Sequence, residues 1–130
     1  MNSDPDGDPY GDRVRELFAN PAHSGDIEGA IPVLVEDQGV RVALVANRED
    51  DLIATLRFRA WGCPHLIAAA EAFCADYEGQ AWSRLEDFRA QEVMQSLPVP
   101  TRKMGRILVL EDAARSLGQS DRQRSIEDTD

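Results

Sequence analysis

At 130 residues the chain has the length of one domain, and its hydrophobic content of 42% predicts a globular fold rather than a disordered chain. The formal net charge of -10 excludes nucleic acid as a natural partner, because its phosphates would be repelled, and favours a basic or neutral protein surface. No stretch is apolar over the length of a membrane helix, and the acidic start is unlike a signal peptide. We therefore expect a cytoplasmic protein with reduced cysteines and no membrane partner.

Polar segments occupy both ends of the chain. Residues 1–9 are rich in Pro, Gly and Asp and predict a disordered acidic tail, and the residues after Gly118 predict a disordered polar tail. A first helix is expected from about Asp12 to Ala19, with its apolar residues on one face. Asn20-Pro21 ends this helix, since the residue before a proline resists helical geometry.

The segment 31–59 has the character of β-strands. Ile31–Val35 is an apolar run interrupted by Pro32, which fits an edge strand. Residues 40–44 and 52–59 each alternate between two sets of side chains, and a period of two is typical of half-buried strands. In the later run one set is Leu52, Ala54, Leu56 and Phe58, and the other is Ile53, Thr55, Arg57 and Arg59. The polar turn 47–51 is expected to join these two strands as a hairpin.

Helices follow the strands. Apolar residues spaced by three and four predict a helix over 64–78, and shorter helices are expected over 82–87 and 90–96. Leu97–Pro100 is a rigid connector, and a last helix is expected from Thr101 to about Leu117. Strands followed by helices predict an α+β domain, in which helices pack on one face of a small three-stranded antiparallel sheet.

Cys63 is the most informative residue. It follows a strand and a glycine and lies beside a helix N-terminus, where the thiolate, which is the nucleophile and metal ligand, is favoured. A small apolar residue packed beneath the helix is the alternative, and the spacing leaves both open. Along a continuous helix Cys74 would lie roughly 16 Å away. That is too far for a disulfide or a shared metal, so Cys74 is expected in the core.

Other candidate sites are sparse. His65 could tune the Cys63 thiol or bind metal, but we expect an exposed residue of the first helical turn. His23 lies in a Pro/Ser/Gly loop without a neighbour that indicates a role. The sequence has no two close pairs of zinc ligands, no phosphate-binding loop and no serine-type triad. We therefore expect no enzymatic activity.

Three blocks of sequence resemble the IscU/NifU family of iron–sulfur cluster assembly scaffolds. "VRELFANP" at 14–21 is similar to the family's opening helix, and 56–80 is similar to its Phe-x-x-x-Gly-Cys-x-x-x-Ile-Ala segment. Residues 97–117 are similar to the region of Leu-Pro-Pro-Val-Lys, His-Cys and Glu-Asp-Ala. The match covers about 10–118, implies an IscU/SufE-like fold for that domain, and leaves 1–9 and 119–130 as tails.

The resemblance implies a site that has lost most of its ligands. Family members assemble a cluster on three cysteines, helped by an aspartate and a histidine. The middle cysteine falls on Cys63, the first has become Asp37, and the aspartate has become Gly39. The His-Cys pair falls on Gly105-Arg106. The chain thus resembles a divergent member with a degenerate metal site.

One thiolate cannot hold a two-iron cluster, which normally needs four ligands. Asp37 and His65 are the remaining candidate ligands beside Cys63, and Arg106 would repel a cation. We expect no stable cluster; an Fe–S cluster, iron or zinc would need ligands from a partner or a second chain. Asp37 and Arg106 could instead form an ion pair that replaces the metal, or both could point into solvent.

The family works with a cysteine desulfurase and a chaperone pair, whose docking motif is blurred here to Val99, Pro100 and Lys103 as candidate partner-binding residues. The leading interpretation is a scaffold-like protein that binds assembly partners rather than a stable cluster. The alternative is a persulfide carrier with Cys63 as acceptor thiol. A scaffold completed by a second chain and a module that lost the pathway also stay open, as does the oligomeric state.

Overall fold

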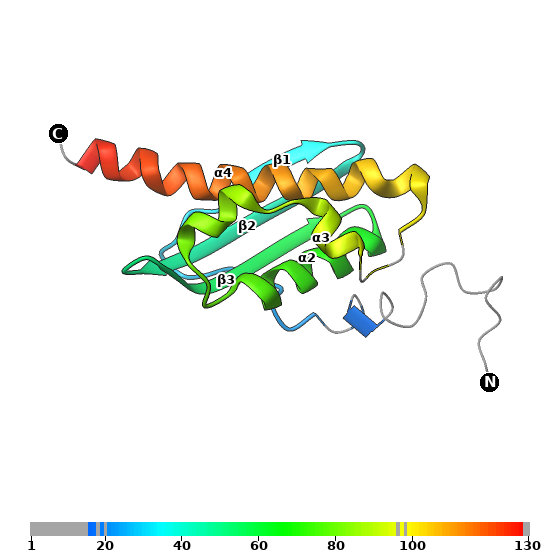
Figure 1. Ribbon diagram of the computed structural model, residues 1–130, viewed down its shortest axis with the longest axis horizontal. Helices are drawn as coiled ribbons and strands as arrows, with labels where there is room; N and C mark the ends of the chain where they lie inside the picture. The colour runs from blue at the N-terminus through cyan, green and yellow to red at the C-terminus, as the bar shows by residue number, and fades with distance from the viewer. Residues whose placement is uncertain (1–15, 18, 20, 96, 98, 129–130) are drawn as a thin grey trace.

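The structure is a computed structural model that describes residues 16–128 apart from 18, 20, 96 and 98, with only the backbone described over 121–128. The predicted tail 1–9 and most of the predicted helix 12–19 lie outside these residues. The elements, with η for a 3-10 helix, are β1 Val33–Asp37, β2 Val40–Glu49, β3 Leu52–Trp61, α2 Pro64–Tyr77, η1 Trp82–Asp87, α3 Ala90–Met94, η2 Thr101–Lys103 and α4 Met104–Asp128 (Figure 1). The predicted α+β class is confirmed.

The sheet has the order β1-β2-β3, and both pairs are antiparallel. Gln38 and Gly39 join β1 to β2 with φ of 54° and 76°, the left-handed conformation that a tight two-residue hairpin turn requires. The short hairpin to β3 also turns on a residue with positive φ, Asp50 at 55°. The predicted turn 47–51 is shorter than expected, because β2 continues to Glu49 and only Asp50 and Asp51 form the turn.

An irregularity in β3 interrupts the predicted alternation. Asn47 pairs with Thr55 and Arg48 pairs with Ile53, so Ala54 is an extra residue in the ladder. An extra residue reverses which side chains face the core. Ile53 is therefore buried together with Leu56 and Phe58, whereas Leu52 is 49% exposed.

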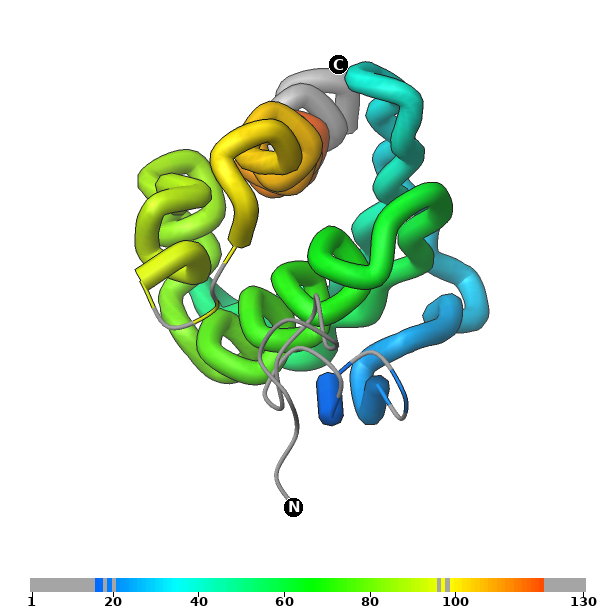
Figure 2. The backbone as a smooth tube through the Cα atoms, turned by 90° about the vertical axis from the view of Figure 1, so that its right-hand side faces the viewer, coloured from blue at the N-terminus to red at the C-terminus, as the bar shows by residue number. Residues whose placement is uncertain are grey.

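The helices cover one face of the sheet (Figure 1). α2 packs on β3, and α4 packs on β1 and β2. Seen from the end, the segment from η1 to α3 lies beside the two long helices, between α4 and α2 (Figure 2). The core between these layers is built from the largest fully buried apolar side chains, namely Leu44, Ile53, Leu56, Phe58, Leu66, Phe73, Leu85, Phe88, Leu97, Ile107 and Leu110.

The last helix differs from its predicted bounds at both ends. It begins at Met104 after the short turn η2, and it continues past Gly118 to Asp128, so the predicted end near Leu117 is wrong. A Cβ added at Gly118 would lie 2.9 Å from Glu86 Cγ. Gly118 therefore does not end the helix; it allows α4 to pass close to η1. The sequence 119–128 holds neither glycine nor proline, and nothing in it stops a helix.

The segment before β1 lines the outer edge of β3. The Gly25 N–H donates to Phe58 O at 2.8 Å, and the Phe58 N–H donates to His23 O at 3.0 Å. These bonds satisfy part of an edge that would otherwise be open. Among the described residues, no helix has the length and apolar character needed to cross a bilayer.

Candidate functional site

Three segments that the sequence analysis singled out lie close together. Gly62, at the end of β3, lies so close to the β1–β2 turn that an added Cβ would be 3.0 Å from Gly39 O. Its φ of 108° also suits only glycine without strain. A Cβ added at Gly105, at the start of α4, would lie 3.3 Å from Gln38 Oε1. The turn 37–39, the Gly62-Cys63 pair and the start of α4 are therefore neighbours in space.

Cys63 is the N-cap of α2, and its carbonyl accepts the Ile67 N–H at 3.1 Å. Only 2% of the residue is exposed, and it packs within the core cluster. Of the two interpretations that the spacing left open, the geometry favours the packed thiol. Any reaction at this sulfur requires the surrounding side chains to move.

Asp37 and Arg106 do not form the hypothesised ion pair in the part of the chain that the structure describes. Asp37 is exposed, and its Oδ1 accepts the N–H of Gln38 at 2.8 Å. Arg106 is half-buried at the start of α4. The Gln38 side chain, which lies against Gly105, occupies the space between the turn and the helix.

The expectation that His65 is exposed is wrong. His65, in the first turn of α2, is fully buried. Burial lowers the pKa of this imidazole, and the positive charges of Lys103, Arg102 and Arg106 lower it further. His65 is thus held neutral, within a positively charged environment that disfavours a metal cation.

The residues present do not fit an iron–sulfur cluster. Among the described residues, no group of three or more His, Cys, Asp or Glu side chains is placed to hold a metal ion. Cys63 is buried, Asp37 is exposed, and Arg106 brings a guanidinium, which repels a cation, to the start of α4. Any cluster would be cargo that needs ligands from outside these residues.

The predicted partner-binding residues Val99, Pro100 and Lys103 lie just before α4, with Lys103 in η2. Val99 packs partly against the core, and Pro100 caps η2 and accepts the Lys103 N–H at 2.8 Å. All three residues are partly exposed. The segment is therefore accessible next to the three converging loops.

The profile of the family described as NifU-like N terminal domain matches residues 9–117. The chain belongs to this family. The resemblance found in the sequence is thereby confirmed over nearly the same residues. No curated protein matches the sequence of this NifU-like domain.

Solved structures share its fold. The N-terminal part of a nitrogen-fixing NifU-like protein from Brucella abortus matches with a TM-score of 0.66 at 16% identity, over 92% of this chain and 95% of that one. A protein from Fervidobacterium islandicum, described as an iron–sulfur cluster assembly scaffold of the SUF system, matches with a TM-score of 0.56 at 17% identity, over 81% of each chain. A hypothetical protein matches with a TM-score of 0.56 at 19% identity, over 88% and 94%.

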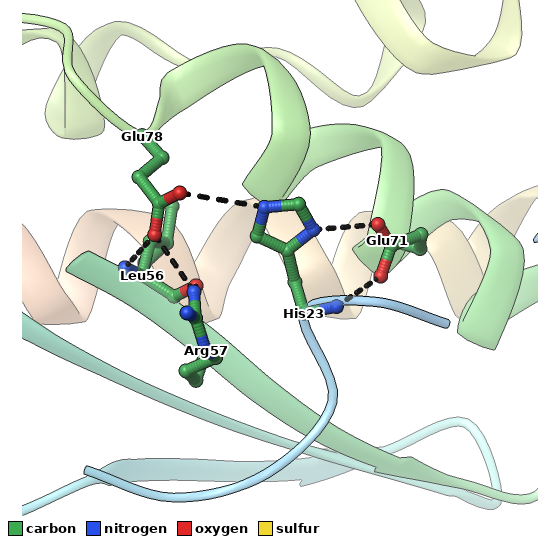
Figure 3. Close-up of polar contacts among 5 residues, drawn as sticks. All are labelled: His23, Leu56, Arg57, Glu71 and Glu78. Atoms are coloured by element: carbon green, nitrogen blue, oxygen red, sulfur yellow. Dashed lines mark hydrogen bonds and ion pairs between the residues drawn. The ribbon is translucent and has the colours of Figure 1, made fainter. Parts of the chain in front are cut away.

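A second polar cluster of this NifU-like domain lies beside α2 (Figure 3). The Glu71 carboxylate, whose side chain is 7% exposed, accepts the His23 N–H at 2.7 Å and lies 2.6 Å from His23 Nδ1. His23 Nε2 faces Glu78 Oε1 at 3.5 Å. The other Glu78 oxygen accepts from Arg57 at 2.7 Å and from the Leu56 N–H at 2.9 Å. The cluster ties the segment before β1 to α2 and β3.

The electrostatics of this cluster are those of a structural network. Burial opposes the charged form of Glu78, but the hydrogen bonds from Leu56 and Arg57 and the charges of Arg57 and His23 outweigh it, so its pKa is lowered. Burial raises the pKa of the nearby Cys74 thiol well above its ordinary value, and the charges of Glu71 and Glu78 raise it further. Cys74 is therefore an inert core thiol, as expected.

The sequence analysis found no role for His23. One signal was present: Glu71 interrupts the apolar face of the predicted helix 64–78, and a charge at such a position needs a partner when it is buried. Which residue supplies that partner depends on how the loop before β1 folds against the helix.

Proposed function

We propose that this NifU-like domain acts in cytoplasmic iron–sulfur cluster assembly by binding assembly partners, and that it neither holds a stable cluster itself nor catalyses a reaction. The partner class is a cysteine desulfurase or another assembly factor. Membership of the family supports the process. The fold that this chain shares with the Fervidobacterium scaffold is consistent with the same process.

The observation that carries the proposal is the charge at the converging loops. Arg106 occupies the position of a family thiolate, and with Arg102 and Lys103 it surrounds a buried, neutral His65. Positive charge around the His65 imidazole disfavours iron binding, although the three loops lie close together. The proposal therefore relies on a surface for partners rather than on a set of iron ligands.

Val99, Pro100 and Lys103 are proposed as part of the partner-binding surface, within a functional domain that spans 10–118. They precede α4 as a partly exposed, proline-bounded segment, and such a segment loses little conformational freedom when it binds. The persulfide-carrier alternative requires Cys63 to reach an incoming sulfur, and its burial weighs against it.

The test has two parts. Anaerobic reconstitution with ferrous iron and sulfide, followed by metal analysis, should leave the protein without stoichiometric iron. Titration calorimetry with the purified cysteine desulfurase of the same organism should show a defined complex. Iron at one or more equivalents that is lost in Cys63→Ser would contradict the cluster-free role.

Absence of a desulfurase complex, with other purified assembly factors also failing to bind, would contradict the partner-binding role. Alkylation of Cys63 in the folded protein distinguishes the persulfide carrier from the partner-binding role. Fast modification by iodoacetamide at neutral pH would favour the persulfide carrier, and slow modification would favour the binding role.

A further inference from the structure

We propose that a hollow beside Trp61, at the end of the sheet next to Cys63, is the docking site for a basic segment of a partner protein, rich in arginine or lysine. This inference rests on the proposed function, because it assigns a chemistry to the partner of the same site. It is carried by the exposure, register and charge of residues on β1, β2 and β3.

The helices leave the other face of the sheet uncovered at this end (Figure 1). Glu36 pairs with Arg41, and Arg41 pairs with Trp61, so the three side chains form one row across the strands. Val40 and Val42, the neighbours of Arg41, are buried toward the helices, so the row faces outward. Trp61 is 44% exposed there.

Leu34 adds a second exposed apolar group to this face. It pairs with Ala43, two residues along from the row of Glu36 and Arg41, and it is 55% exposed. An exposed tryptophan and leucine on one uncovered face are typical of a surface that another molecule covers, because tryptophan is among the side chains that contribute most to protein interfaces.

The surface beside Trp61 is hollowed. A hollow of about 540 Å³ is lined by Glu36, Asp37, Gly39, Val40, Arg41, Trp61 and Gly62. Its volume lies within the range of about 300–1,000 Å³ found for sites that take a small ligand or a few side chains. The lining combines two glycines and Val40 with three charged side chains and the Trp61 ring.

The hollow already binds a cation of its own chain. The Arg41 guanidinium lies 5.5 Å from the centre of the Trp61 ring, and its Nη2 is 2.8 Å from Glu36 Oε2. An aromatic face with a carboxylate beside it is the arrangement that recognises a guanidinium or an ammonium group. Both side chains of this ion pair are about half exposed, so an incoming arginine can displace Arg41 or stack next to it at little cost.

Asp37 supplies a second carboxylate that is open to a partner. Its Oδ1 accepts the Gln38 N–H, and its Oδ2 makes no hydrogen bond or ion pair with any described residue. The net charge of -10 attracts a basic segment from a distance. Arg102 and Arg106 do not line the hollow. Their positive charges repel a basic segment, so the surface that binds such a segment ends on the side toward α4.

The position of the hollow connects it to the proposed function. Gly62 lines it and is followed directly by Cys63, and Gly39 belongs to the turn where the family has its first ligands. A basic segment bound here lies beside Gly62 and the turn 37–39, at the edge of the three converging loops. Such a partner would be oriented by the acidic hollow on one side and by Arg102 and Arg106 on the other.

The experiment titrates a blocked hexa-arginine peptide into the protein, with hexa-glutamate as the opposite-charge peptide. The chain has two tryptophans, and Trp82 is 7% exposed, so acrylamide quenching reports mainly on Trp61. Hexa-arginine should protect Trp61 from acrylamide, and hexa-glutamate should not. The double variant Glu36→Gln/Asp37→Asn should bind hexa-arginine about fivefold more weakly.

A matched variant separates a site from general attraction. Asp76→Asn/Asp87→Asn removes the same charge from exposed positions outside the hollow and should bind as the natural chain does. Trp61→Phe, measured by calorimetry, should weaken binding with an unchanged circular dichroism spectrum. Equal weakening by the two double variants, or no effect of Trp61→Phe, would overturn the docking site. Neither result depends on whether a desulfurase binds.

Discussion

Replacing His23 by alanine tests whether the cluster in Figure 3 holds the segment before β1 in place. The change removes the ring that lies 2.6 Å from Glu71 Oε2 and 3.5 Å from Glu78 Oε1. The backbone N–H of residue 23 can still donate to Glu71 Oε1. Glu71 therefore loses one of its two partners while its side chain stays buried.

The expected cost follows from burial. A charged group that is 7% exposed and loses one hydrogen bond costs about 2 kcal/mol, and loss of the longer contact with the partly exposed Glu78 adds less than about 1 kcal/mol. The free energy of unfolding should thus fall by about 2–3 kcal/mol. For a domain of this size, the melting temperature should fall by roughly 10 °C.

Urea unfolding at pH 7, followed by far-UV circular dichroism, measures this change. The matched control is Arg41→Ala, which breaks an ion pair with Glu36 that is about half exposed and should cost no more than about 1 kcal/mol. A second variant, Glu71→Gln, tests the same contact from the other side. A loss for His23→Ala no larger than for Arg41→Ala would refute the argument that a buried network fastens this segment.

Three further predictions concern α4, α2 and the converging loops. Gly118→Ala should destabilise the protein by about 1–2 kcal/mol in urea unfolding, because the added Cβ has no room beside η1. The lowered pKa of Glu78 stabilises the fold at neutral pH, and this stabilisation is lost as the pH falls below the ordinary value of 4.5 toward the lowered one. Glu78→Gln should therefore unfold with a weaker dependence on pH in that range. Asp37→Cys/Arg106→Cys, which returns two thiols beside Cys63, should gain iron in anaerobic reconstitution, and a lack of gain would show that the loops no longer converge closely enough.

Local sequence was sufficient for most elements. The period of two over 40–44 and the period of three and four over 64–78 predict strands and a helix that the structure confirms. Within the predicted turn 47–51 the chain turns at Asp50 and Asp51, and Asp50 has a positive φ, which aspartate accepts more readily than most residues. These features depend on residues close together in the chain.

The errors have a common cause. The extra residue Ala54, the continuation of α4 past Gly118 and the burial of His65 each depend on a partner element. Gly118 has the residue type of a helix stop, yet it allows close contact with η1. His65 has a polar side chain in a first helical turn, yet it is fully buried.

The sequence by itself determined the family and the α+β class, because residue identity and short-range spacing carry both. Only the tertiary structure decided that Cys63 and His65 are buried, that Trp61 borders a hollow, and that His23 meets a glutamate 48 positions away. Such contacts are set by how the helices pack on the sheet, and packing is a property of the whole core rather than of any local stretch of chain.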